Sequence, residues 1–147
     1  MQAPISRRAA YAGAVLFAAL ASSGCSGPKM EFAGVEGTIT MGGKPLAGVV
    51  VYFYPDDTGP EQLPFARGTT DGSGNYKLTS SQGAPGVLVG RNRVVVNWPP
   101  RERSDDPAAR SRPLGPPIPI PYTQASDTPL IVEVKAGGPQ TINLTIP

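Results

Sequence analysis

Short stretches in which hydrophobic and polar residues alternate run along the chain from about residue 35 to its end. Residues 35–41, 130–135 and 142–146 alternate with a period of two and are rich in β-branched residues, which is the pattern of half-buried strands. Less regular apolar stretches predict further strands at 46–54, 65–70, 75–79 and 91–98, with residues 87–89 paired locally. None of these stretches has helical spacing, so the pattern predicts an all-β fold.

Glycine- and proline-rich segments between these stretches predict how the strands connect. Gly42-Gly43 predicts a tight turn, residues 71–74 (DGSG) predict a hairpin, and residues 136–139 (AGGP) predict a closing hairpin that docks on the core. We therefore expect about seven strands in a single antiparallel β-sandwich of immunoglobulin-like or prealbumin-like type.

A proline-rich segment, residues 99–129, interrupts the strand pattern. Residues 101–112 are charged and poor in apolar side chains, which predicts a flexible excursion rather than a second domain. Residues 113–121 are spaced like extended polyproline backbone. We expect a loop that crosses one end of the sandwich, in preference to a peptide-recognition ligand.

The first 24 residues have the layout of a cleaved secretory signal. Arg7 and Arg8 precede an apolar stretch, residues 9–20, and small residues follow. As a helix this stretch would rise only about 18 Å, at about 1.5 Å per residue, whereas a bilayer core is about 30 Å thick. The segment therefore predicts export rather than a permanent span.

Cys25, the only cysteine, lies where a bacterial lipoprotein signal places its lipidated residue. Two or more acyl chains there would hold the protein stably on a membrane, with residues 25–32 as the tether. Two alternatives remain open: cleavage before Ser22, after an A-x-A site, and twin-arginine export. We expect a cell-envelope location, with the anchor facing the periplasm or the cell surface.

Composition excludes several kinds of chemistry. The chain has no histidine, so a Ser-His-Asp triad, a Cys-His dyad and His-ligated metal sites lack their parts. The chain has thirteen basic and eleven acidic residues, and removal of Arg7 and Arg8 with the signal leaves eleven of each. A chain with no net positive charge lacks the basic surface that binds nucleic acid. The carboxylate pairs Asp56-Asp57 and Asp105-Asp106 are typical of solvated loop charge. We expect no enzyme activity, metal or cofactor.

Several motifs occur in the order found in a known family. Residues 35–39 (VEGTI), 43–49 (GKPLAGV) and 70–76 (TDGSGNY), followed by Gly90, Val94 and Val96, resemble carboxypeptidase regulatory-like domains, and Asn92 stands where an aromatic residue is usual. The segment from residue 118 to residue 137 resembles the tail of small bacterial lipoproteins built from one such domain.

The resemblance covers residues 33–147 and implies a prealbumin-like sandwich close to transthyretin in architecture. It implies export but little about function, because fold does not settle function. Related hydroxyisourate hydrolases and intradiol dioxygenases depend on histidine, so neither activity is carried over to this chain.

Two groups of residues are candidates for ligand binding. Asp71, Ser73 and Asn75 alternate like the early ligands of a calcium loop, but Gln82 stands where the late carboxylate should be, so we favour a simple turn. Tyr52 and Tyr54 share one face of a strand and could line a sugar-binding surface, although packing is the more economical interpretation.

The sequence therefore predicts an exported, lipid-anchored β-sandwich with a structural or protein-interaction role. The alternative is a small-ligand or glycan-binding lipoprotein that uses Tyr52 and Tyr54.

Overall fold

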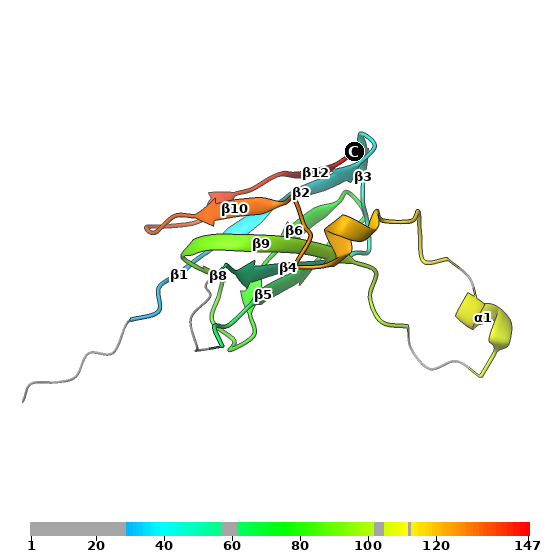
Figure 1. The fold of residues 1–147 in the computed structure, drawn as a ribbon, viewed down its shortest axis with the longest axis horizontal. Coiled ribbons are helices and arrows are strands. Elements are labelled where there is room, and N and C mark those ends of the chain that lie inside the picture. Colours follow the sequence, from blue (N-terminus) through cyan, green and yellow to red (C-terminus); the bar gives the residue numbers. More distant parts are fainter. Residues whose placement is uncertain (1–28, 57–61, 102–104, 112) are drawn as a thin grey trace, which may run out of the picture.

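A computed structural model describes residues 29–56, 62–101, 105–111 and 113–147 of the chain, and these form an all-β sandwich (Figure 1). The described residues contain twelve short strands, one five-residue helix and one 3-10 turn, where the sequence predicts about seven longer strands. The count is higher because the predicted strand 75–79 is divided between the two sheets, and because two-residue strands also form at 32–33, 44–45 and 140–141.

The first sheet has the strand order β10-β9-β4-β5-β7, and all its pairings are antiparallel. Its strands are β4 (Val50–Pro55), β5 (Ala66–Thr69), β7 (Thr79–Ser80), β9 (Gly90–Asn97) and β10 (Ile131–Val134). The central strands β4 and β9 pair over six residues, from Val50 opposite Asn97 to Pro55 opposite Asn92. One face of this sheet covers the core and the other faces outward.

The second sheet is built around β2 (Val35–Met41), which pairs on both sides. Its antiparallel neighbours are β3 (Lys44–Pro45) and β6 (Asn75–Lys77), and its parallel neighbours are β11 (Gln140–Thr141) and β12 (Leu144–Ile146). The expectation of a wholly antiparallel sandwich is therefore wrong for the C-terminal strands. A separate two-stranded ladder joins β1 (Phe32–Ala33) to β8 (Val87–Leu88), so residues 87–88 pair with the start of the fold rather than locally.

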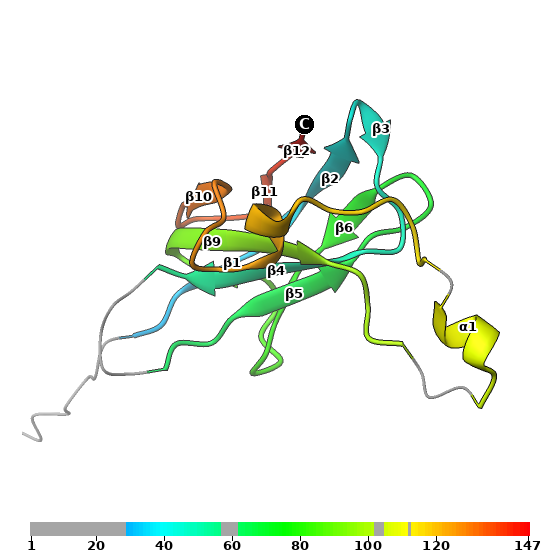
Figure 2. The same cartoon turned by 45° about the vertical axis from the view of Figure 1, so that its right-hand side comes forward.

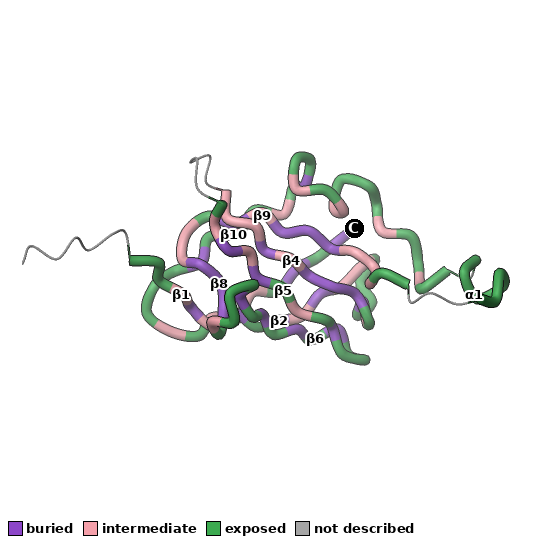
Figure 3. The backbone as a smooth tube through the Cα atoms, turned by 90° about the horizontal axis from the view of Figure 1, so that it is seen from below, coloured by how far each residue is buried: buried purple, intermediate pink, exposed green. Residues whose placement is uncertain are grey.

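The core lies between the two sheets, as the buried stretches of the tube in Figure 3 indicate. Phe53 of the first sheet and Tyr76 of the second meet across it with ring centroids 6.3 Å apart. Apart from Asn92, the other large side chains that are fully buried are aliphatic: Val35, Ile39, Val49, Val51, Leu78, Val87, Val94, Val96, Val134 and Ile146. The alternation along β2 predicts that Val35 and Ile39 point to the same side, and both are buried.

The two predicted hairpins are turns that join different sheets. The turn at Asp71–Gly74 forms, with Gly74 N–H donating to Asp71 O at 3.0 Å, but β5 on one side belongs to the first sheet and β6 on the other to the second. Residues 135–139 likewise connect β10 of the first sheet to β11 of the second. Turn residues specify a chain reversal, but they do not specify that the flanking strands pair with each other.

The proline-rich segment leaves the sandwich between β9 and β10 and contains two helical pieces that the sequence does not predict. Helix α1 (Pro107–Ser111) buries none of its residues and stands away from the sheets in both Figure 1 and Figure 2. The 3-10 turn η1 (Ile120–Thr123) lies against β9, where Asn97 Nδ2 donates to the carbonyl of Thr123 at 3.3 Å. The chain enters the fold at Lys29 at the opposite end of the long axis from α1 (Figure 1).

Candidate ligand-binding face

Tyr52 and Tyr54 lie on the outward face of the first sheet. Strand β4 alternates so that Val51 and Phe53 are fully buried in the core, while Tyr52 and Tyr54 are half-buried on the other side. The two tyrosines are therefore not core residues. They share this face with Arg67 and Val95, which the register places directly opposite Tyr52 on the neighbouring strands.

Three aromatic rings form one cluster on this face. The rings of Tyr52 and Tyr54 have centroids 5.9 Å apart and are nearly parallel, at 13°. Phe65, which precedes β5, contacts both, with centroid distances of 6.2 Å to Tyr52 and 5.5 Å to Tyr54. Partial burial, with a smaller contribution from Tyr52, raises the pKa of Tyr54 above its usual value. The sequence signals the two tyrosines, but it does not signal Phe65 because the register of β5 against β4 is needed to place it.

An ion cluster adjoins the aromatic rings. Asp56 accepts from Nε of Arg93 at 2.6 Å and pairs with Nε of Arg91 at 3.0 Å. Arg93 lies opposite Tyr54 in the register and also donates from Nη1 to the carbonyl of Ala125 at 3.2 Å. The expectation of solvated loop charge is wrong for Asp56, whose side chain is 15% exposed, and Asp57 lies outside the described residues. The cluster ties the end of β4 to the start of β9.

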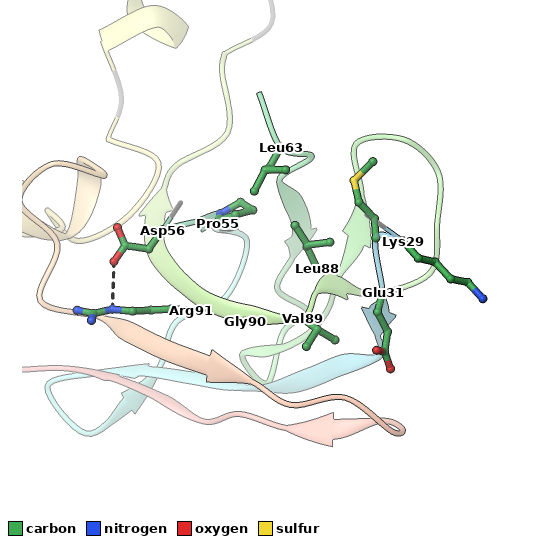
Figure 4. Close-up of a pocket in the computed structure, with 10 residues that line it drawn as sticks. Lys29, Glu31, Pro55, Asp56, Leu63, Leu88, Val89, Gly90 and Arg91 are labelled. Carbon is green, nitrogen blue, oxygen red and sulfur yellow. Dashed lines mark ion pairs between the residues drawn. The ribbon is translucent and has the colours of Figure 1, made fainter. Parts of the chain in front are cut away.

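A hollow of about 490 Å³ lies beyond this ion cluster, at the end where the chain enters the fold (Figure 4). Pro55, Leu63 and Leu88 form its apolar part, and Asp56 pairs with Arg91 at its rim. The ammonium of Lys29 points away from this ion pair in Figure 4. The hollow therefore has no set of polar groups converging on one point, which a specific ligand site needs.

The Asp71 loop is a hydrogen-bonded turn. The backbone N–H groups of Ser73 and Asn75 both donate to Oδ1 of Asp71 at 2.9 Å, and Asn75 Nδ2 donates to Oδ2 at 3.0 Å. These hydrogen bonds, that of the Asn75 side chain first, lower the pKa of Asp71. Both carboxylate oxygens are thus used within the turn, which supports the turn interpretation over a calcium loop. In the part of the chain that the structure describes, no three acidic or cysteine side chains gather as a metal site would need.

Asn92 occupies the buried position where the resembling family has an aromatic residue. It is fully buried at the start of β9, and its Nδ2 donates to the carbonyls of Leu88 at 3.1 Å and Gly90 at 2.9 Å. These bonds hold the bend between β8 and β9, where Gly90 has a φ of 121°. Its Oδ1 has no partner among the described residues. The side-chain amide of Asn92 therefore stabilises this bend by hydrogen bonds, at the position where the family that the sequence resembles usually has an aromatic ring.

The predicted lipidation site, Cys25, and the predicted signal lie outside the described residues. Within the residues that are described, no helix has both the length and the apolar character needed to cross a membrane.

Comparison with known proteins gives one limited similarity. A stretch of 50 residues is 48% identical to transthyretin-like protein 33 of Caenorhabditis elegans, which is 33% of this chain and 35% of that protein. No family model and no solved structure matches the chain. Because the match spans about a third of the relative's length, its activity and partners are not transferred. Together with the two-sheet architecture, the similarity supports a transthyretin-like β fold for this chain.

Proposed function

We propose that this protein is an exported, non-catalytic binding module, held to a membrane by lipid at Cys25, that takes a small ligand or glycan on its outward aromatic face. The observation that supports this proposal most directly is the cluster of Tyr52, Tyr54 and Phe65 on the side of the first sheet that faces away from the core. Val95, which shares this face, is buried, so part of the face is packed, but Tyr52, Tyr54 and Phe65 remain half-buried. The exposed parts of these rings form the surface that we assign to a ligand.

The chemistry of this face suits a ligand that has both apolar and polar surface. Aromatic rings provide large, rigid contact area, and tyrosine hydroxyls add hydrogen bonds. Arg67 lies directly opposite Tyr52 on the neighbouring strand, so its guanidinium is a donor beside the rings, whereas Arg93 opposite Tyr54 already bonds Asp56 and Ala125. A sugar, with one apolar ring face and a rim of hydroxyl groups, has the complementary pattern.

The proposed anchor is compatible with the position of this face. The described chain begins at Lys29, at one end of the long axis, and Cys25 precedes it by four residues. Strand β4 runs along the long axis of the sandwich and ends near the point at which the chain enters the fold, where Pro55 and Lys29 line one hollow (Figure 1). A short tether would therefore place the aromatic cluster on the side of the sandwich, close to the anchored end. The absence of histidine from the chain supports binding rather than catalysis.

A thermal-shift and calorimetric screen against a panel of oligosaccharides tests the binding function. A true ligand should raise the melting temperature, and Tyr52→Ala or Phe65→Ala should abolish the shift while the circular dichroism spectrum stays unchanged. Tyr122→Ala, which removes a half-buried ring on η1 instead, is the matched control and should leave the shift intact. No saccharide shift with the intact protein, or equal loss in all three variants, would refute the proposal.

The intact mass of the protein from the membrane fraction tests the anchor. A chain that begins at Cys25 and carries two or three acyl chains supports the proposal. A chain that begins at Ser22 with an unmodified thiol contradicts it and would make the protein freely secreted.

A protein-interaction role is the second candidate, and the edge strand β10 favours it. β10 ends the first sheet, and its Ile131 is 41% exposed. An edge strand with an exposed apolar residue is a site at which another chain can add. Ile131→Lys should weaken such an association and leave saccharide binding unchanged, so pull-down and calorimetry on this one variant separate the two functions.

A further inference from the structure

A hollow of about 490 Å³ opens beside Tyr52 at the β5 side of the first sheet. Tyr52 lines this hollow and Tyr54, whose ring stacks on that of Tyr52, does not. The remaining groups that matter here are two cations and two hydroxyls: Arg67, Lys77, Thr69 and Thr79. Its volume falls within the range of about 300–1,000 Å³ that is typical of small-molecule sites.

The two sheets come together at this hollow, and a glycine makes that possible. A Cβ on Gly68 would lie 2.2 Å from the carbonyl oxygen of Lys77, so only glycine lets β5 and β6 cross so closely. The crossing brings Lys77 of the second sheet beside Arg67 and Thr69 of the first. Thr79 lies directly opposite Arg67 in the register. The four polar side chains are thus positioned by paired or tightly crossed backbone rather than by a long loop.

The residues that line the hollow carry a net positive charge. Among the described residues no carboxylate lies within 4.0 Å of the charged groups of Arg67 or Lys77, and no acidic residue lines the hollow, although the register places Glu36 opposite Lys77 on the neighbouring strand. Arg91 and Arg93 on the same sheet provide the contrast, because both are bonded to Asp56. Two neighbouring cations repel each other unless an anion lies between them. The hollow is therefore complementary to a negatively charged ligand.

A second hollow of about 470 Å³ continues the first. Arg67 and Thr79 line both hollows, and Phe65, Ser80 and Ser81 line the second one. Arg67 therefore stands between two adjacent spaces, each with one aromatic ring and several hydroxyl groups. This repeat of ring and hydroxyls on either side of a cation suits a ligand longer than one sugar unit.

We propose that this double hollow binds an acidic oligosaccharide, with the carboxylate of a hexuronic acid unit held by Arg67 and Lys77. The planar guanidinium of Arg67 can donate two parallel hydrogen bonds to a carboxylate, and the ammonium of Lys77 adds a second charge. Tyr52 contacts the apolar face of the sugar ring, and Thr69 and Thr79 bind its hydroxyl groups. This assignment rests on the proposed binding function and adds the class of ligand to it.

Calorimetric titration with a tetrasaccharide of galacturonic acid, and with its carboxyl-reduced neutral counterpart, tests the assignment. We expect the acidic form to bind at least about tenfold more tightly, because hydrogen bonds to a charged group are the stronger kind. Its affinity should also fall as salt is raised, since the cations are exposed. Arg67→Gln and Lys77→Gln should each remove about tenfold in affinity for the acidic form and change the neutral form little.

Lys44→Gln, which removes one exposed cation from the second sheet, is the charge-matched control and should bind like the native protein. Equal binding of both tetrasaccharides that is lost in Tyr52→Ala but kept in Arg67→Gln overturns the assignment and leaves the proposed function standing. Binding of inorganic phosphate as tight as that of the acidic tetrasaccharide also overturns it, because the site would then be a general anion site. No binding of any saccharide refutes both.

Discussion

At the scale of single residues, Tyr76 shows how one side chain joins both sheets and the C-terminal segment. Its ring is buried against Phe53, and its hydroxyl donates to the carbonyl of Ile142 at 2.5 Å. Ile142 lies between β11 and β12, where the parallel pairing with β2 is interrupted. The hydroxyl therefore supplies a hydrogen bond at a point where the ladder with β2 is broken.

Tyr76→Phe should lower the free energy of unfolding by about 1–2 kcal/mol, because it leaves the Ile142 carbonyl without this donor. Urea unfolding monitored by circular dichroism measures the change. Tyr54→Phe is the matched control, since the Tyr54 side chain lies on the outward face and is half-buried. A loss for Tyr76→Phe no larger than that of the control would contradict the assigned role of the hydroxyl.

Alkaline pH should destabilise the protein through the same residue. Burial raises the pKa of Tyr76 well above its ordinary value of about 10. Above pH 10 the unfolded chain loses this proton while the folded chain keeps it, so stability is complete below pH 10 and declines as the pH rises beyond it. Unfolding midpoints measured from pH 8 to pH 11 should show this decline. Tyr76→Phe should flatten it, and an unchanged slope in that variant would assign the effect to other groups.

At the scale of elements, β2 depends on one glycine to pair on both sides. A Cβ on Gly37 would lie 1.9 Å from the carbonyl oxygen of Ile142, so the chain between β11 and β12 passes directly over this residue. On its other side Gly37 is opposite Tyr76 of β6. Neither neighbouring backbone can move away without breaking a ladder.

Gly37→Ala should therefore destabilise the protein by at least about 2 kcal/mol, since overpacking against a fixed backbone is costly. Gly34→Ala is the matched control. It adds the same methyl group nearby on the chain, meets its nearest neighbour at an ordinary 3.5 Å, and has no positive φ. The melting temperatures of Gly37→Ala and Gly34→Ala, measured in one buffer, test this prediction. Equal values would mean that the crossing of Ile142 over β2 is not a fixed feature.

Sequence patterns predict the strands better than they predict the partners of those strands. The half-buried strand predicted at residues 35–41 is confirmed as β2, in which Val35 and Ile39 are buried. The sheet switch near Leu78 could not be predicted, because β6 and β7 are parts of one short stretch that pairs first with β2 and then with β5. Long-range pairing is decided by packing of the whole sandwich rather than by local composition.

The same limit applies to the candidate site. Alternation along β4 predicts that Tyr52 and Tyr54 share a face, which the structure confirms. Phe65 and Arg67 are placed by the pairing of β5 with β4, and Lys77 is placed by the pairing of β6 with β2 and its close crossing with β5. Their place beside the tyrosines had no signal in the sequence. The partners of the strands and the composition of the site are therefore set by the packing of whole elements rather than by local sequence.

At the scale of the whole molecule, the segment between β9 and β10 leaves the sandwich and returns to it. Its root, the part around Trp98 and Pro116, is held by contacts, whereas its tip, around α1, is not part of the core. At the root, Trp98 Nε1 donates to the carbonyl of Pro116 at 3.2 Å. Gly115 lies flat against the indole, where a Cβ would be 2.2 Å from the ring. At the tip, α1 buries no residue, and Arg101 donates to the carbonyls of Ala109 and Arg110. The tip therefore packs on itself, and the excursion meets the sandwich through Trp98, η1, Ala125 and Thr128.

Replacement of residues 102–112 by a short Gly-Ser linker should leave the free energy of unfolding within about 0.5 kcal/mol of the native value, as for other exposed changes. A short linker can close the gap because Arg101 and Pro113 line the same hollow beside Trp98.

Gly115→Ala should instead displace the indole of Trp98 from Pro116. Trp98 is the only tryptophan, so its fluorescence reports this contact directly. The emission should move to longer wavelength in Gly115→Ala and stay fixed in the linker variant, because only the first disturbs the root. A linker variant that melts much earlier, or that shifts the emission as Gly115→Ala does, would mean that the tip supports the sandwich after all.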